Sequence, residues 1–226
     1  MIFSEFQNIM SSHRMSRYLN AVGRNTRKAM TLYRLNLRLS QELFTVESCF
    51  EIALRNKIDS HYTTFFGNNW LRDSALPGGM LSTRKCGKTP YIILEGQKRL
   101  PVYSHSKLLA EMELGFWRYL FAPHQFRSGG QNLLAIFPSK PISTPILRYD
   151  HNFVFNELEK INNLRNRLAH HEPVCFLSGK PIKDTIYART HYSLILNLFI
   201  WMQIDEASIL YGLDHIKEIC NKIDSL

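Results

Sequence analysis

Residues 27–65 read RKAMTLYRLNLRLSQELFTVESCFEIALRNKIDSHYTTF and contain no proline. Apolar side chains recur here at intervals of three, four and their multiples, the period of a helix with one buried face. These positions are Met30, Tyr33, Leu37, Phe44, Phe50, Leu54 and Ile58. Gly67-Asn68-Asn69 supplies a stop signal directly afterwards. The run predicts one long helix, or two shorter helices separated near Ser40 or Thr45.

The remaining sequence also favours helices. Apolar periodicity predicts four more, at residues 105–122, 147–170, 184–204 and 205–224. No segment predicts a strand with comparable strength, and residues 174–177 are the one stretch compatible with extended backbone. Ser178-Gly179-Lys180-Pro181 predicts a turn after it. We therefore expect an all-α bundle of long antiparallel helices, with residues 1–226 forming a single domain.

Two segments are punctuated by proline and glycine, at residues 73–104 and 124–145. The first is also basic and carries Arg84, Lys85, Lys88, Lys98 and Arg99. We expect residues 73–104 to form an irregular loop insertion with at most one short helix. The five cations make this insertion a candidate RNA-binding arm that contacts phosphates.

The chain has 226 residues, a formal net charge of +9 and an isoelectric point near 9.5. Residues 1–40 contain seven arginines and lysines against Glu5 alone. Excess positive charge favours an anionic partner, with nucleic acid first and an acidic membrane surface second. A solvated basic face without a ligand is the alternative.

The four cysteines are scattered, and none belongs to a CxxC pair that would indicate a zinc or redox site. The N-terminus lacks the basic start and apolar run of a signal peptide. The most apolar stretch, residues 194–204, is too short to span a bilayer. We therefore expect a cytoplasmic protein with reduced thiols, no cofactor, no bound metal and no membrane association.

Residues 164–173 read LRNRLAHHEP and gather charged and polar groups at an expected helix end. Such a cluster is poor core material, because buried charge is unfavourable unless it is paired. Arg165 can hold a phosphate oxyanion, and His170 or His171 can transfer a proton near neutral pH. On a helix, Asn166 and His170 nearly share a face. The alternative is a helix C-terminus that is merely stabilised by cations.

An arginine followed by a histidine within six residues is by itself a weak pattern. It also occurs at Arg55 and His61, Arg99 and His105, and Arg118 and His124. The 164–173 cluster differs in its density of polar groups and its position at a helix end. Because His170 and His171 would point about 100° apart on a helix, joint metal coordination by the two is disfavoured.

The cluster suits cleavage of RNA without a metal ion. RNA carries its own nucleophile, the 2′-hydroxyl, which a catalyst must activate. Arginine stabilises the charged phosphorane, and a protonated histidine donates to the leaving 5′-oxygen. A two-fold dimer would bring two clusters together and supply both a proton donor and a proton acceptor.

Residues 165–173 resemble the RNxxAHHEP motif of the Abi-like (abortive infection) bacterial proteins, members of the HEPN superfamily of helical nucleases. Three other stretches resemble that family in matching order, namely YRLNLRLS at 33–40, FEIALRNKI at 50–58 and ELGFWRYLF at 113–121. The resemblance extends over about residues 14–205. It implies a HEPN-like helical bundle, a homodimer formed through the motif helices, and a metal-independent ribonuclease of phage defence or toxin–antitoxin type.

The same resemblance assigns catalysis to Arg165, Asn166 and His170, with His171 as an alternative because an arginine-x5-histidine spacing also fits. Arg167 and Glu172 complete the cluster as supporting residues.

Glu51 and Arg55 are four residues apart, which is typical of an intrahelical ion pair. The functional interpretation is that they support the cluster and orient Arg165 or His170 from a neighbouring helix. The aromatic run at 116–121 favours burial in the core over base stacking.

Proteins of this fold can bind RNA without cutting it, so a non-catalytic RNA-binding or scaffolding HEPN-like module is the alternative function. Because an unrestrained ribonuclease harms its host, we also expect a cognate antitoxin protein or a structured RNA as a partner.

Overall fold

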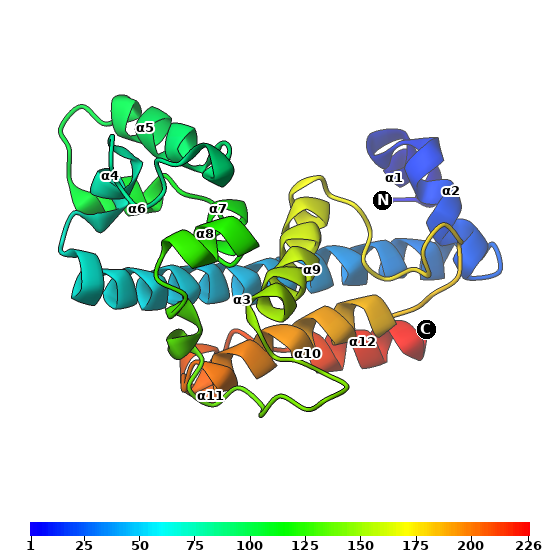
Figure 1. Ribbon diagram of the computed structural model, residues 1–226. Coiled ribbons are helices and arrows are strands. Elements are labelled where there is room, and N and C mark those ends of the chain that lie inside the picture. The colour runs from blue at the N-terminus through cyan, green and yellow to red at the C-terminus, as the bar shows by residue number, and fades with distance from the viewer. The chain divides into compact units, whose positions relative to one another are not determined.

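The computed structural model describes residues 1–226 and is all-helical, with twelve α-helices, two 3-10 helices and a single isolated β-bridge (Figure 1). The predicted all-α class is confirmed. The chain divides into two compact units, which are unit 1 (residues 1–49, 163–196 and 206–226) and unit 2 (residues 50–162 and 197–205). The single domain over 1–226 and the antiparallel bundle stay predictions.

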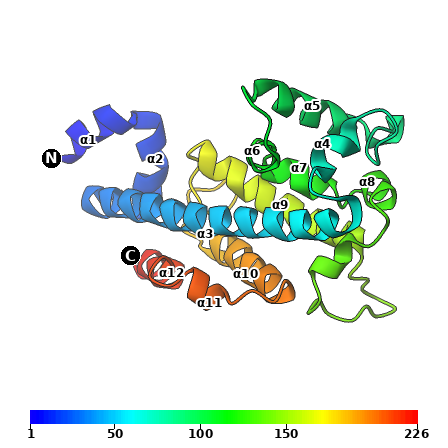
Figure 2. The ribbon, with the colours of Figure 1, turned by 90° about the vertical axis from the view of Figure 1, so that its left-hand side faces the viewer.

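Helix α3 (Thr26–Phe66) is one unbroken helix of 41 residues, which Figure 2 shows along its length. The break weighed at Ser40 or Thr45 is absent. The Thr45 hydroxyl instead donates to the Gln41 carbonyl at 3.1 Å, so its polar group is satisfied within the helix.

The buried face of α3 includes four of the seven apolar positions that the sequence pattern indicates, namely Tyr33, Phe50, Leu54 and Ile58. Leu37 and Phe44 are 44% and 47% exposed, although both were assigned to the apolar face. Both lie about 100° or more around the helix from their buried neighbours Leu39 and Leu43. The buried apolar residues of the helix are Ala29, Leu32, Tyr33, Leu39, Leu43, Val46, Phe50, Leu54, Ile58 and Tyr62.

In unit 1, helices α1 (Phe3–Met10) and α2 (Ser12–Ala21) precede α3. The buried Tyr18 ring of α2 contacts two other rings edge-on. Its centroid lies 5.0 Å from that of Tyr33 in α3 and 4.9 Å from that of Phe176. These contacts pack the segment after α9 against α2 and α3.

That segment, residues 170–185, contains the predicted turn around Gly179, whose φ of 71° suits glycine. Extended backbone is limited to a short pairing: Phe176 bridges Lys183, and the Leu177 N–H donates to the Ile182 carbonyl at 3.0 Å. The segment is a small hairpin rather than a strand of a sheet.

In unit 2, the region 73–104 is more helical than expected. It contains the end of α4 (Trp70–Ala75), η1 (Arg84–Cys86) and α5 (Thr89–Arg99). Pro90 lies in the first turn of α5, where its missing N–H breaks no helical bond. Gly96 allows close packing, because a Cβ there would lie 2.6 Å from Met112 Cε. The proline and glycine that predicted a loop therefore start and pack a helix.

The single helix expected over 105–122 is two, α6 (His105–Ala110) and α7 (Leu114–Tyr119). The Met112 carbonyl between them accepts from the indole N–H of Trp117 at 3.2 Å, instead of continuing a helical ladder. The region 124–145, expected to be irregular, contains most of α8 (Pro123–Ser128) and all of η2 (Leu133–Ile136).

Helices α9 (His151–Ala169) and α10 (Ile186–Trp201) agree with the predicted segments to within a few residues. The helix expected over 205–224 is instead α11 (Glu206–Ile209) and α12 (Ile216–Asp224). Gly212 lies between them at a φ of 73°, which a continuing right-handed helix cannot accommodate. None of the helices combines the length and the apolar character needed to cross a membrane.

Candidate functional site

Helix α9 ends in a defined turn that holds the 164–173 cluster. The N–H of His171 donates to the Leu168 carbonyl at 3.0 Å, and the N–H of Glu172 donates to the Arg167 carbonyl at 2.9 Å. This pair of bonds is a Schellman termination, and His171 occupies its left-handed position with a φ of 54°. The prediction that the helix stops near His171 is confirmed.

Arg167 fastens this turn. Its Nη2 donates to the Pro173 carbonyl at 2.6 Å, and its Nε lies 3.6 Å from a carboxylate oxygen of Glu172. The guanidinium carbon lies 4.5 Å from the centroid of the Tyr187 ring. Because these contacts engage the guanidinium, Arg167 supports the conformation of the turn, and Glu172 is its exposed partner.

Two arginines of α2 hold the chain that follows. Arg14 Nη1 donates to the His171 carbonyl at 3.2 Å. Arg17 Nη2 donates to the carbonyls of Leu177 and Lys180, at 3.3 and 3.1 Å. Sequence reasoning counted both arginines only as part of a basic region, because nothing local in the sequence indicates contacts with residues more than 150 positions away.

The remaining cluster residues lie at the surface or close to it. The side chains of Asn166, His170 and His171 are exposed, and Arg165 is half-buried. The His170 N–H donates to the Asn166 carbonyl at 3.0 Å, a bond of helical register. Asn166 and His170 therefore belong to one face, as predicted, whereas His171 departs from the helical series. The face presents an amide and an imidazole to solvent.

The residues that follow the cluster in the sequence, 174–176, are buried. The buried Asn36 of α3 accepts from the Val174 N–H at 2.9 Å. Burial raises the pKa of the neighbouring Cys175 thiol to about 12, so this thiol is protonated and poorly nucleophilic at neutral pH.

The histidines of the three competing arginine–histidine spacings have different environments. His61 Nε2 lies 2.9 Å from Asn132 Oδ1, and His105 Nε2 lies 2.7 Å from Asp59 Oδ1. Both imidazoles are held in polar contacts within unit 2. His124 is exposed and lines a cavity in the same unit.

Their arginines are also engaged. Arg118 Nη2 lies 2.8 Å from Glu159 Oε1, and its guanidinium stacks 3.9 Å from the Phe155 ring centroid. Arg55 Nε donates to Asn56 Oδ1 at 3.4 Å. Glu51 and Arg55 belong to unit 2 and the 164–173 cluster to unit 1, so their supporting role stays a prediction.

The five predicted RNA-binding residues fall into two groups. Lys98 pairs with Glu95 at 2.7 Å and Arg99 pairs with Glu111 at 2.8 Å, so an internal carboxylate offsets each charge. Arg84, Lys85 and Lys88 are exposed in η1 and at the start of α5. The second group is the better candidate for contact with an anion.

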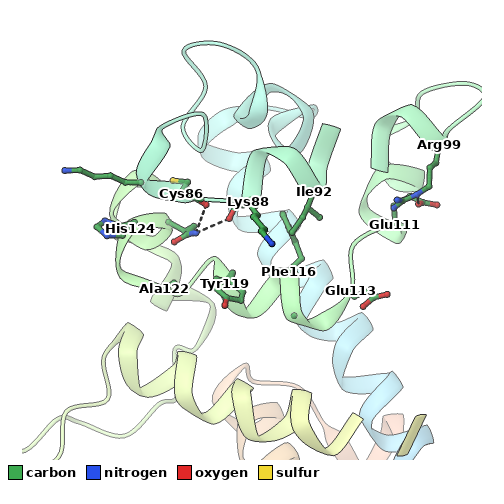
Figure 3. Close-up of a pocket in the computed structure, with 15 residues that line it drawn as sticks. Cys86, Lys88, Ile92, Arg99, Glu111, Glu113, Phe116, Tyr119, Ala122 and His124 are labelled. Carbon is green, nitrogen blue, oxygen red and sulfur yellow. Dashed lines mark hydrogen bonds and ion pairs between the residues drawn. The ribbon is translucent and has the colours of Figure 1, made fainter. Parts of the chain in front are cut away.

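Lys85, Lys88 and Arg99 also border a cavity of about 720 Å³ in unit 2, which Figure 3 shows in close-up. Sequence reasoning missed this cavity and its residues Ile92, Phe116, Tyr119 and His124. Tyr119 was assigned with its aromatic neighbours to the core, yet it is 49% exposed, whereas Phe116, Trp117 and Phe121 are buried. The short length of α7 places Tyr119 at a helix end, and periodicity did not predict that end.

No group of three or more His, Cys, Asp or Glu side chains in the structure is arranged to hold a metal ion. Searches of protein-family models, of curated proteins and of solved structures found no match to this chain.

Proposed function

We propose that this chain is a metal-independent endoribonuclease of the Abi-like type within the HEPN superfamily, with its catalytic site at the exposed end of α9. The observation that carries the proposal is the common face of Asn166 and His170 at a helix end beside Arg165. Arg167 and Arg14 support it, because their contacts fix the turn and leave the imidazole of His170 at the surface.

In this mechanism the 2′-hydroxyl of RNA attacks the adjacent phosphorus and its proton passes to a basic histidine. The bond from phosphorus to the 5′-oxygen breaks, and a protonated histidine gives that oxygen a proton. The products are a 2′,3′-cyclic phosphate and a 5′-hydroxyl. Arg165 stabilises the negative charge of the phosphorane, and Asn166 orients a phosphate oxygen or the imidazole.

His170 is the residue we assign to proton transfer, in preference to His171. His170 continues the helical register and shares a face with Asn166. His171 takes the left-handed capping position, and its carbonyl is bound to Arg14. This division of roles assigns one histidine to chemistry and the other to the backbone turn.

Proton donor and proton acceptor are both required, so we propose a homodimer in which each copy contributes one His170 to a composite site. In the cell, such an activity would serve phage defence or a toxin–antitoxin pair. A cognate antitoxin protein or a structured RNA would restrain it in the cytoplasm.

The test is incubation of purified protein with end-labelled RNA in EDTA. Wild type is expected to cut and to leave 2′,3′-cyclic phosphate ends, while His170→Ala and Arg165→Ala do not. His171→Gly is the matched control, because it changes the adjacent histidine and is expected to retain cleavage. Cleavage at the wild-type rate by both His170→Ala and Arg165→Ala would refute the proposal. Gel-shifted but intact RNA with the wild type would favour the RNA-binding module.

Mixing experiments test the composite site. His170→Ala protein is exchanged into wild-type dimers in increasing amounts. If the site needs both histidines, the remaining activity is proportional to the square of the wild-type fraction. A linear decline would instead show that each copy cuts alone.

A further inference from the structure

The cavity of unit 2 lies outside the catalytic proposal and has the features of a ligand site of its own. Its volume of about 720 Å³ falls in the range of roughly 300–1,000 Å³ that small-molecule sites span. Ile92, Phe116, Tyr119 and Ala122 give it an apolar wall. Sites of this type combine such a wall with a few polar groups that fix the ligand's orientation.

The charges around the cavity are unevenly distributed. Arg99 and Glu111 form a 2.8 Å ion pair at one side, and Glu113 lies toward that side in Figure 3. His124 lies at the other side with Cys86, and Lys88 lies between that side and Glu113, next to Ile92. Lys85 and Lys88 both line the cavity, are exposed and have no carboxylate partner. The part of the cavity that these two lysines line therefore favours an anionic group.

Tyr119 offers a flat surface to a ligand. Its side chain is 49% exposed, and its ring contacts Phe155 edge-on at a centroid distance of 5.6 Å. The Arg118 guanidinium carbon lies 5.4 Å from the centroid over one face of the Tyr119 ring, so the stacking face proposed for a ligand is the opposite one. A planar aromatic group can stack on such a face.

The amide of Gln125 joins two walls of the cavity. It is 6% exposed, and its Nε2 donates to the Cys86 carbonyl at 3.1 Å and to Thr89 Oγ1 at 3.0 Å. These bonds connect α8 to η1 and α5 and hold two walls of the cavity together. Both N–H groups of the amide are used, which leaves Oε1 as an acceptor for an N–H of a ligand.

We propose that this cavity binds a nucleoside phosphate, with the phosphate at Lys85 and Lys88 and the base against Tyr119. A planar, hydrogen-bonding ring joined to an anion matches the stacking face, the buried amide and the cationic side together. The ligand is a free nucleotide or one nucleotide of an RNA chain, since both carry this chemistry. The inference stands without the cleavage mechanism, because none of the proposed catalytic residues belongs to the cavity.

Binding is measured by calorimetry with the four nucleoside 5′-monophosphates and with a 2′-O-methyl RNA hexamer. The hexamer has no free 2′-hydroxyl, so cleavage cannot affect the readout and failure of the nuclease proposal does not alter this test. Saturable binding of a monophosphate assigns the site to free nucleotides. Binding of the hexamer alone assigns it to an RNA chain.

Variants then locate the ligand. Lys88→Ala and Tyr119→Leu are each expected to weaken binding about tenfold. Ile92→Glu, at a position that is 41% exposed, brings a negative charge to the cavity and is expected to abolish binding. Lys107→Ala and Tyr91→Leu are matched controls, because both residues are exposed and neither lines the cavity. Both controls are expected to bind as the wild type does.

Three results overturn the proposal. The first is that neither the monophosphates nor the hexamer binds. The second is that the control variants weaken binding as much as the cavity variants do, which would indicate general surface charge. The third is that decanoate occupies the site while no nucleotide competes with it, which would assign the cavity to an acyl chain.

Discussion

Arg14 of α2 donates from Nη1 to the backbone carbonyl of His171, 157 residues further along the chain, at 3.2 Å. The bond connects the basic N-terminal region to the turn that ends α9. An arginine that composition alone would count as a surface charge is thus part of the support for the candidate catalytic cluster. This support has consequences that can be measured without knowing the substrate.

Removal of the Arg14 side chain should loosen the turn at His171 and the hairpin that follows it. We expect Arg14→Ala to lower the free energy of unfolding by about 1 kcal/mol, the typical contribution of one hydrogen bond. Amides of residues 171–180 should exchange with deuterium faster, as mass spectrometry would detect. Arg27→Ala, at an exposed position in the first turn of α3, should leave that exchange unchanged. Equal protection of the segment in both variants would contradict the assigned role of Arg14.

Glycine at position 171 should stabilise the protein. His171 has a φ of 54°, and a side chain in this region carries a penalty of about 1–2 kcal/mol that glycine avoids. His171→Gly is therefore expected to raise the urea midpoint, with a gain of about 1 kcal/mol after the entropy of the unfolded glycine is allowed for. His170→Gly should lower the midpoint, because that residue keeps the helical register. A lower midpoint for His171→Gly would mean that the imidazole has an essential contact.

Arg167 should matter more for folding than for chemistry. Arg167→Ala removes the bond to the Pro173 carbonyl and the contact with the Tyr187 ring, and should lower stability by about 2 kcal/mol. Tyr187→Leu removes only the ring contact and should lower it by about 0.5–1 kcal/mol. Urea unfolding followed by circular dichroism gives both values. Identical losses in the two variants would show that the bond to Pro173 adds nothing.

The buried thiol of Cys175 should make the fold sensitive to alkali. Its folded pKa of about 12 exceeds its ordinary value of 9.0, so between these pH values the unfolded chain releases a proton that the folded chain retains. Stability is therefore complete below about pH 9 and declines as pH rises toward 12, by about 1.4 kcal/mol per pH unit for one group.

Cys175→Ala should reduce the steepness of that decline. Burial also raises the pKa of Tyr18, Tyr62 and Tyr192, so the variant should retain some alkaline sensitivity. Urea midpoints of both proteins between pH 7.5 and 10.5 give the comparison. Parallel curves for wild type and variant would show that Cys175 does not titrate differently in the folded state.

The all-α class could be predicted because helical periodicity is a local property of the chain. The helical run of α3 follows from spacing, although spacing left open whether it was one helix or two, and the stop of α9 near His171 follows from proline chemistry at Pro173. Helix ends in unit 2 were harder to predict. Gly96 indicated a loop, but in the structure it packs against Met112, a contact that depends on residues outside its own segment.

The residues of the candidate site were also predicted only in part from the sequence. The motif identified Arg165, Asn166 and His170 from their types and spacing. It did not distinguish His170 from His171, because both fit the spacing. The distinction came from the Schellman turn, in which one histidine keeps the helical register and the other takes a positive φ.

By itself, the sequence determined the helical class, the basic character and the chemical composition of the 164–173 cluster, because these depend on residue identity and short-range spacing. Only the tertiary structure decided that Arg14 and Arg167 support the turn, that Tyr119 is exposed, and that Lys85 and Lys88 border a cavity. The physical reason is that hydrogen bonds, burial and cavities join residues far apart in the chain. Their pairing is set by packing of the whole unit, which local propensity does not encode.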